Sequence, residues 1–201
     1  MSFILNNSMR IVLFIILLFP SSALFTQSGS SQGFRVDLSG GITRSLYNEG
    51  SFQFGEYSRS GISGDLRIIY QSENLLGIGI ETGYFPLAFI KQDQFTNEFG
   101  VSDIRANISA IPIFANFLFD FGNIFFNAST GYYLVSSRII AFGDKSFSSS
   151  FDFGFSLSLG YRKMINKKYG FGAEFKSHHL VDTPQLAFTL QLLFSCNISE
   201  L

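Results

Sequence analysis

Residues 151–162 read Phe-Asp-Phe-Gly-Phe-Ser-Leu-Ser-Leu-Gly-Tyr-Arg, and this stretch decides the fold. Every odd position from Phe151 to Tyr161 is large and apolar, whereas every even position is Gly, Ser or charged. Successive side chains of a β-strand point to opposite faces, so the stretch predicts a strand with one apolar face and one small, polar face. The apolar face points inward in a soluble sandwich and outward into lipid in a membrane barrel.

The same alternation recurs along the chain and predicts eight strands. Their expected ranges are 33–43, 61–71, 75–86, 106–121, 123–136, 149–162, 169–178 and 185–195. Each is close to or longer than the ~9–11 residues that a tilted membrane strand requires. Pro112 interrupts the fourth range and cannot donate a ladder hydrogen bond, so we expect a β-bulge there.

The predicted connections alternate between short and long. The short ones are 72–74, 121–123 and 163–168, and the mostly longer, more polar ones are 44–60, 87–105, 137–148 and 179–184. In an up-and-down outer-membrane barrel, short turns face the periplasm and long loops face outward. With both termini periplasmic, the three short stretches fall where periplasmic turns belong, which a soluble sandwich does not require.

The composition agrees with a membrane barrel and excludes several other classes. Charged residues make up 14% of the chain and aromatic residues 17%, with a net charge of −1 and hence no basic footprint for nucleic acid. After residue 25 no apolar run approaches the ~20 residues of a membrane helix. Cys196 is the single cysteine, so neither an intrachain disulfide nor a cysteine metal cluster is expected.

The first residues have the features of an export signal. Arg10 precedes the apolar stretch 11–19, and Pro20 and the small residues 21–23 follow it. We predict a signal peptide over 1–23, a flexible lead-in over 24–32, a barrel over 33–196 and a short tail over 197–201. Met9 is an alternative start, because the signal is already complete from there.

Tyrosines fall near the predicted strand ends, on the apolar side. Tyr70, Tyr161 and Tyr169 lie at the periplasmic ends, and Tyr84 and Tyr132 lie toward the outer ends. Aromatic girdles at both membrane interfaces have this placement.

Ten charged residues fall on the predicted inner face. They are Arg35, Asp37, Asp65, Arg67, Glu81, Asp120, Asp152, Arg162, Glu174 and Lys176. Because buried charges are costly unless paired, we expect them to pair across the lumen, with Asp152 and Arg162 as barrel-filling ion partners. An eight-stranded barrel is just wide enough to be filled by side chains, so the set predicts a structural plug; a narrow polar pore is the alternative.

Ser177, His178 and His179 are the one candidate for catalysis, with Asp182 as a nearby acid. Adjacent strand residues point to opposite faces, so they form a poor triad. No carboxylate or cysteine lies at ligand spacing from the two histidines. We therefore predict no catalytic, cofactor-binding or metal-binding residues, no cofactor and no enzymatic activity.

Two segments resemble the small outer-membrane β-barrel family of OmpA/OmpX type. They are Ala110-Ile111-Pro112-Ile113-Phe114-Ala115-Asn116-Phe117 and Asn127-Ala128-Ser129-Thr130-Gly131-Tyr132-Tyr133, which are similar to an Ile-Pro strand and the following Gly-Tyr strand of porin-like members. The resemblance implies insertion into a Gram-negative outer membrane by the barrel assembly machinery. Residues 195–201 after Phe194 depart from the terminal aromatic common in such barrels.

The predicted fold is all-β, a single eight-stranded antiparallel up-and-down transmembrane barrel after a cleaved signal peptide. We expect a structural or surface-interaction role in the bacterial outer membrane, with outer-membrane lipid and an extracellular or periplasmic protein as partners. A narrow pore or transporter and a secretion-apparatus component are alternatives, followed by a lipid-modifying enzyme of the outer rim.

Overall fold

The computed structural model describes residues 33–46, 56–71, 76–97, 100–183 and 185–198. These residues form β1 (Gly33–Leu46), β2 (Glu56–Ser58), β3 (Ser60–Gln71), β4 (Leu76–Asn97), β5 (Gly100–Phe121), β6 (Ile124–Ala141), β7 (Asp144–Met164), β8 (Tyr169–Leu180) and β9 (Gln185–Ile198). The predicted signal peptide and lead-in lie outside the described residues, and β9 continues two residues past the predicted barrel end at 196. In the described part of the chain, no helix is long and apolar enough to cross a membrane.

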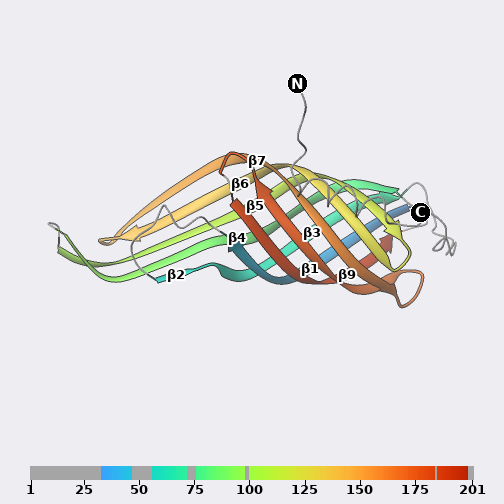
Figure 1. The fold of residues 1–201 in the computed structure, drawn as a ribbon, viewed down its shortest axis with the longest axis horizontal. Helices are drawn as coiled ribbons and strands as arrows, with labels where there is room; N and C mark the ends of the chain where they lie inside the picture. The colour runs from blue at the N-terminus through green and yellow to red at the C-terminus, as the bar shows by residue number, and fades with distance from the viewer. Residues whose placement is uncertain (1–32, 47–55, 72–75, 98–99, 184, 199–201) are drawn as a thin grey trace, which may run out of the picture.

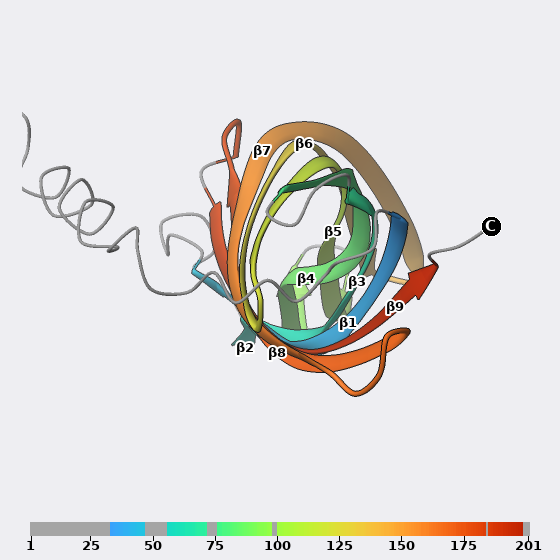
Figure 2. The same ribbon diagram turned by 90° about the vertical axis from the view of Figure 1, so that its right-hand side faces the viewer.

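Eight of the strands close into one antiparallel ring. The order is β4-β3-β1-β9-β8-β7-β6-β5, and pairing of β4 with β5 completes the circle (Figures 1 and 2). Strands adjacent in sequence are adjacent in the ring, and β1 pairs with β9 from Phe34↔Ile198 to Leu46↔Leu186. The short β2 pairs with the outer part of β4 beside the ring. The predicted eight-stranded up-and-down barrel is therefore confirmed.

Four strands are much longer than the sequence predicted. The ranges 87–105 and 137–148 were expected to be loops, but β4 continues to Asn97, β5 begins at Gly100, and β6 and β7 are joined by the turn Phe142-Gly143. Figure 1 shows these strands extending past the others at one end of the molecule. We call residues 91–97, 100–109, 136–141 and 144–150 the projecting wall. The polar residues in these ranges indicate that both faces of the strands meet water. Such residues can still form the backbone hydrogen bonds of a β-ladder, so the ranges are strands and not loops.

The expected bulge at Pro112 is wrong. Pro112 pairs with Tyr133 in an unshifted register with β6. On the β4 side the register is also the same before and after Pro112, and the shifts occur at Pro86/Ala88 and Gln92/Phe95. Proline is tolerated at strand positions that need not donate to the ladder, so its presence alone does not require an inserted residue.

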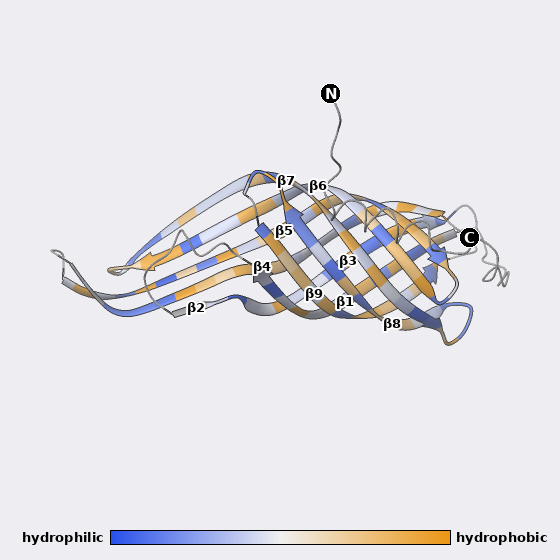
Figure 3. Cartoon of the chain, viewed as in Figure 1, coloured by the Kyte–Doolittle hydropathy of each residue, from blue (hydrophilic) through white to orange (hydrophobic). Residues whose placement is uncertain are grey.

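The barrel exposes its apolar face and buries its polar face. In the decisive stretch, Phe151 is 69% exposed and Leu159 is 58% exposed, while Asp152 and Ser158 are buried. Figure 3 shows the corresponding alternation of hydrophobic and hydrophilic residues along the strands. The five predicted girdle residues Tyr70, Tyr84, Tyr132, Tyr161 and Tyr169 are all exposed. This distribution is the reverse of that in a soluble barrel.

Two apolar clusters lie inside the barrel, one toward each end. One consists of Ile69, Leu118, Phe125 and Leu193. The other, toward the projecting wall, consists of Phe85, Leu87, Ala110, Phe114, Tyr133, Leu180 and Ala187. The charged residues of the lumen are distributed between and around these clusters.

Substituting Gly160 tests the packing around Phe125. A Cβ at Gly160 would lie 2.2 Å from Cζ of the Phe125 ring, whereas a Cβ at Gly40 would meet nothing nearer than 3.8 Å. We expect Gly160→Ala to lower the free energy of unfolding by about 1–3 kcal/mol, because the ring must shift. Gly40→Ala should leave it within about 0.5 kcal/mol. Urea unfolding in detergent micelles measures both, and equal stabilities would contradict this packing.

Candidate functional site

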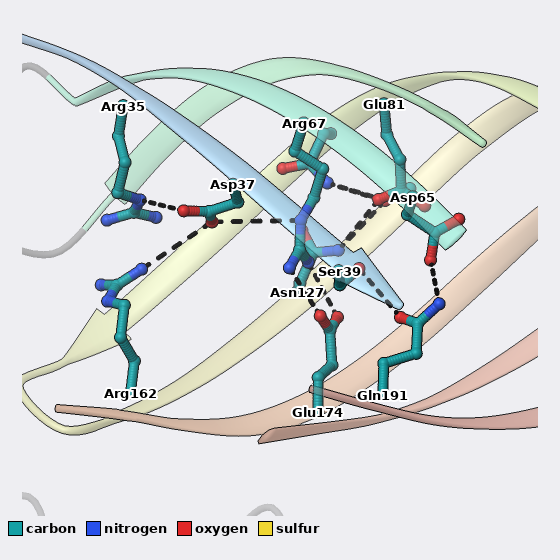
Figure 4. Close-up of polar contacts among 12 residues, drawn as sticks. Arg35, Asp37, Ser39, Asp65, Arg67, Glu81, Asn127, Arg162, Glu174 and Gln191 are labelled. Atoms are coloured by element: carbon teal, nitrogen blue, oxygen red, sulfur yellow. Dashed lines mark hydrogen bonds and ion pairs between the residues drawn. The ribbon is translucent and has the colours of Figure 1, made fainter. Parts of the chain in front are cut away.

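All ten charged residues predicted for the inner face are buried in the lumen. Their exposed fractions range from 0% for Lys176 to 8% for Asp120. They come from β1, β3, β4, β5, β7 and β8, so contacts among them can join strands that are not neighbours in the ring. Figure 4 shows part of this network.

Lys176 lies at the centre of one half of the network. Its Nζ is 2.7 Å from Oδ2 of Asp65 and 3.0 Å from Oε1 of Glu81. Gln191 Nε2 donates to the same Asp65 oxygen at 2.7 Å, and Ser39 Oγ donates to Gln191 Oε1 at 3.1 Å. One cation therefore holds two carboxylates from two different strands.

The second oxygen of Glu81 is held by neutral side chains. Its Oε2 accepts from Asn116 Nδ2 at 3.0 Å, Ser129 Oγ at 3.1 Å and Asn127 Nδ2 at 3.4 Å. Asn116 lies on β5 and Asn127 and Ser129 lie on β6, at positions that alternate with the outward apolar residues of these strands. The alternation of side chains along a strand shows from the sequence that these residues point inward. It does not show which carboxylate they contact.

Arg67 and Glu174 form a bidentate ion pair across the lumen. Arg67 Nη1 donates to Oε1 at 2.8 Å and Nη2 donates to Oε2 at 2.5 Å. Arg67 Nε also lies 4.0 Å from Oδ2 of Asp37. Paired, planar geometry of this kind gives the strongest charge-assisted hydrogen bonds available to side chains.

Two further arginines surround Asp37 and Asp120. Arg35 Nε lies 3.1 Å from Oδ1 of Asp37, and Arg35 Nη1 lies 3.3 Å from Oδ2 of Asp120. Arg162 contacts Asp120 directly and has its Nη1 3.9 Å from Oδ2 of Asp37. Each arginine thus bridges both carboxylates, and this group joins β1, β5 and β7.

Asp152 has a different role from the one expected. Instead of serving as an ion partner in the lumen, its Oδ1 accepts from the backbone N–H of Asp182 at 3.0 Å and its Oδ2 from that of Thr183 at 2.9 Å. Asp152 therefore caps the turn between β8 and β9. Of the two residues predicted as ion partners, Arg162 makes ion pairs and Asp152 binds backbone.

Removing the Asp152 carboxylate should loosen that turn. We expect Asp152→Ala to cost about 1–3 kcal/mol, because two backbone donors lose their acceptor. Amide hydrogen exchange at residues 182–183 should accelerate. Asp144→Ala is the matched control, since Asp144 is exposed at the start of the same strand. Unchanged exchange in Asp152→Ala would contradict the cap.

The candidate catalytic residues are not gathered into a triad. His178 is buried, with Nδ1 3.2 Å from the Tyr133 hydroxyl and its ring stacked 4.2 Å from that of Phe85. Ser177 faces the opposite way and donates to the backbone oxygen of Leu157 at 3.3 Å. Asp182 accepts from the backbone N–H of Phe153 at 3.0 Å. In the part of the chain that is described, no three His, Cys, Asp or Glu side chains gather as a metal site.

The sequence analysis missed the aromatic cluster around His178. Tyr133 is the residue next to a predicted girdle tyrosine, and strand parity therefore turns it inward. Its ring packs edge-on against Phe114 at 4.7 Å and Phe85 at 5.6 Å. These rings fill the lumen at the end toward the projecting wall.

The arrangement is suited to holding the barrel walls together. Its hydrogen bonds join residues as far apart in sequence as Ser39 and Gln191, which are 152 positions apart. Four cations lie among six carboxylates, and most carboxylates meet two or more donors. Such a network opposes both widening of the barrel and slippage of strand register.

Comparisons with known proteins find the same fold. Neisserial surface protein A superposes with a TM-score of 0.52 and 13% identity, over 83% of this chain and 97% of that one. Ail, the attachment invasion locus protein of Yersinia pestis, gives 0.50 and 13%, over 81% and 99%. A structure of Ail with the heparin analogue sucrose octasulfate gives 0.51 and 11%, over 81% and 99%. No family model and no curated protein matches the sequence.

Proposed function

We propose that this chain, which has the fold of the small eight-stranded outer-membrane barrels, is an integral protein of the bacterial outer membrane. Its role is structural or surface-interacting, without enzymatic activity. The single observation that carries the proposal is the apolar belt exposed around a lumen of buried, paired charges. Outer-membrane lipid is the partner of the belt, and the barrel assembly machinery is the partner during insertion.

The belt favours lipid over water as the surrounding medium. Leu38, Ile62, Ile80, Leu157 and Leu192 lie on different strands, and each is at least 42% exposed. Contiguous apolar surface of this extent on a monomer marks contact with a membrane or a partner. The belt runs around the whole circumference of a closed barrel. A lipid bilayer contacts the whole of such a belt, whereas a protein partner would cover only one side.

The filled lumen favours a closed barrel over a pore. Apolar clusters lie toward both ends, and ion pairs span the middle. An eight-stranded barrel leaves little interior volume once such side chains are in place. In planar bilayers we expect no unitary conductance above background, and discrete channel events would favour the narrow pore or transporter instead.

The projecting wall is the part available to an external partner. It consists of two β-hairpins that rise past the ends of β8, β9, β1 and β3 (Figure 1). Binding surfaces held on a rigid scaffold are positioned without further ordering. A role in a secretion apparatus instead predicts that deletion of the gene blocks export of other proteins.

A lipid-modifying activity is the least supported alternative, because Ser177 and His178 lie on opposite faces of β8. If His178 served catalysis, His178→Ala would abolish a change in the lipid profile of expressing cells. We expect expressing cells to show no such change.

Fractionation combined with a gel assay tests the proposal. We expect the chain in the outer-membrane fraction, with an apparent mass on unboiled gels that shifts after boiling. A purified chain that is monomeric in buffer without detergent would contradict the proposal.

A further inference from the structure

Four buried oxygen atoms near Glu81 have no hydrogen-bond partner among the described residues. They are Oδ1 of Asn116, Oδ1 of Asn127, Oγ of Ser156 and Oγ of Ser158, and we call them the oxygen cluster. The residues that carry them are at most 3% exposed. A buried polar atom without a partner costs free energy, so four of them side by side indicate that a ligand binds there.

Strand register brings these atoms to one part of the barrel wall. Ser129 on β6 pairs with Asn116 on β5 and with Ser156 on β7. Two residues before Ser129, Asn127 pairs with Ser158. Directly paired residues have Cβ atoms ~5 Å apart, and all of these side chains point inward. The four oxygens therefore share one section of the lumen, around Ser129.

The two amide groups are fixed by the same pair of atoms. Nδ2 of Asn116 lies 3.0 Å from Oε2 of Glu81 and 3.0 Å from Oγ of Ser129. Nδ2 of Asn127 lies 3.4 and 3.3 Å from the same two atoms. Each nitrogen thereby uses both of its N–H groups. The amide oxygens share a carbon with these nitrogens, so they too lie beside the Glu81 carboxylate, where they can accept.

Small side chains line this section of β7, and an aromatic ring packs on the wall on either side of it. A Cβ at Gly154 would lie 2.5 Å from Cε2 of the Tyr133 ring, and a Cβ at Gly160 would overlap the Phe125 ring. Between the two glycines the inward residues are Ser156 and Ser158, whose side chains are too short to cross the lumen. Side chains fill most of an eight-stranded barrel, so a ligand bound between the rings must be small.

The charge of this part of the lumen identifies the ligand as a cation. Lys176 contacts both Asp65 and Glu81, which leaves one negative charge without a positive partner. Elsewhere in the lumen three arginines contact three carboxylates, and these residues are Arg35, Arg67, Arg162, Asp37, Asp120 and Glu174. A buried charge is costly unless it is paired, so a bound cation beside Glu81 lowers the free energy of the folded barrel.

We propose that the oxygen cluster binds one Na⁺ ion. Amide and hydroxyl oxygens replace the hydration shell of a monovalent cation, as backbone carbonyls do in selectivity filters. One excess negative charge matches one positive charge. A divalent cation prefers carboxylate ligands. Here the Asp65 and Glu81 oxygens already accept hydrogen bonds from Lys176 and from the two amide groups.

The ion stabilises the closed lumen instead of crossing it. The apolar cluster with Phe125 lies toward one end of the barrel, and the cluster with Tyr133 lies toward the other. The oxygen cluster lies between them, because its β7 serines are between the glycines on which these two rings pack. The site is independent of the outer face of the barrel and of any external partner.

Urea unfolding at several sodium concentrations tests the proposal. The chain is folded in nonionic detergent micelles, and N-methyl-D-glucamine chloride replaces sodium chloride so that ionic strength stays constant. N-methyl-D-glucamine is too bulky for a filled eight-stranded lumen. A ligand bound only by the folded state stabilises it, so each tenfold rise in sodium above the dissociation constant should lower the equilibrium constant of unfolding about tenfold.

Removing the two serine hydroxyls separates ion binding from packing. Without sodium, Ser156→Ala with Ser158→Ala removes only unpartnered buried hydroxyls and should leave the barrel at least as stable. The same variant should need about 30-fold more sodium for equal stabilisation, because two of four oxygen ligands are lost. Ser45→Ala is the matched control. Ser45 is buried and its hydroxyl has no partner in the described residues, but it lies on β1, separated from β6 by β9, β8 and β7.

Three outcomes would overturn the proposal. Equal stability in sodium and in N-methyl-D-glucamine would mean that water or a proton satisfies the oxygen cluster. Full sodium dependence in Ser156→Ala with Ser158→Ala, or its loss in Ser45→Ala, would place the ion elsewhere. Stabilisation by magnesium chloride that depends on the two serines would contradict the match of single charges. Because the barrel is studied in micelles, none of these results depends on the proposed outer-membrane location.

Discussion

Arg67→Met is expected to lower the free energy of unfolding by about 3–5 kcal/mol, because it leaves a buried charge without its partner. Glu174 is 1% exposed and receives both of its short hydrogen bonds, at 2.8 and 2.5 Å, from Arg67. Methionine fills much of the arginine volume, so the loss measured is that of charge pairing rather than of packing. Urea unfolding in detergent micelles, followed on unboiled gels, gives the value.

A second substitution separates the effect of the unpaired Glu174 charge from the effect of changing the side chain at position 67. Adding Glu174→Gln to Arg67→Met removes the orphaned charge and should recover part of the loss. Lys91→Met is the surface control, since its ion pair with Asp93 is half exposed and should be worth less than about 1 kcal/mol. If Arg67→Met costs no more than Lys91→Met, the lumen network does not stabilise the barrel.

Leu157→Arg is expected to cost about 2–4 kcal/mol in vesicles, because it places a charge on the lipid face near the bilayer midplane. Leu157 is 42% exposed and lies midway between Phe153 and Tyr161 on the outward face of β7. The folded fraction at each urea concentration is measured on unboiled gels, from the amount of chain that migrates at the apparent mass of the folded barrel.

The matched control is the same substitution farther along the same face. Ser149 is an exposed residue of the projecting wall, eight positions from Leu157. Ser149→Arg should change the free energy of unfolding by no more than about 0.5 kcal/mol. Equal tolerance of arginine at both positions would mean that the apolar face meets water.

The strand pattern was predictable because one face of each strand is uniformly apolar. In β7, the odd residues from Phe151 to Tyr161 determine which side faces outward, and the even residues follow. The same parity placed all ten charged residues inside. The partners were not predictable, because Lys176 and Asp65 are 111 positions apart and meet only through the relative stagger of β3 and β8.

The ends of the strands were less predictable than their middles. Beyond the belt both faces of β7 are exposed, so the two-residue alternation that marks a half-buried strand fades from Asp144 to Ser150. Asp152 was assigned to an ion pair because its side chain points inward. Its actual partners are backbone N–H groups of the turn at residues 182–183, and their position depends on where β8 ends.

Site-directed spin labelling of β7 tests the central claim most directly. Single cysteines replace Phe155, Ser156, Leu157 and Ser158 in turn, in a Cys196→Ser chain inserted into vesicles, and each carries a nitroxide. Collision rates are measured with oxygen, which concentrates in lipid, and with a water-soluble nickel chelate. We predict high oxygen accessibility at 155 and 157 and low accessibility at 156 and 158. High oxygen accessibility at 156 and 158 instead of 155 and 157, or access of the nickel chelate to 155 and 157, would contradict a barrel with its apolar face in lipid.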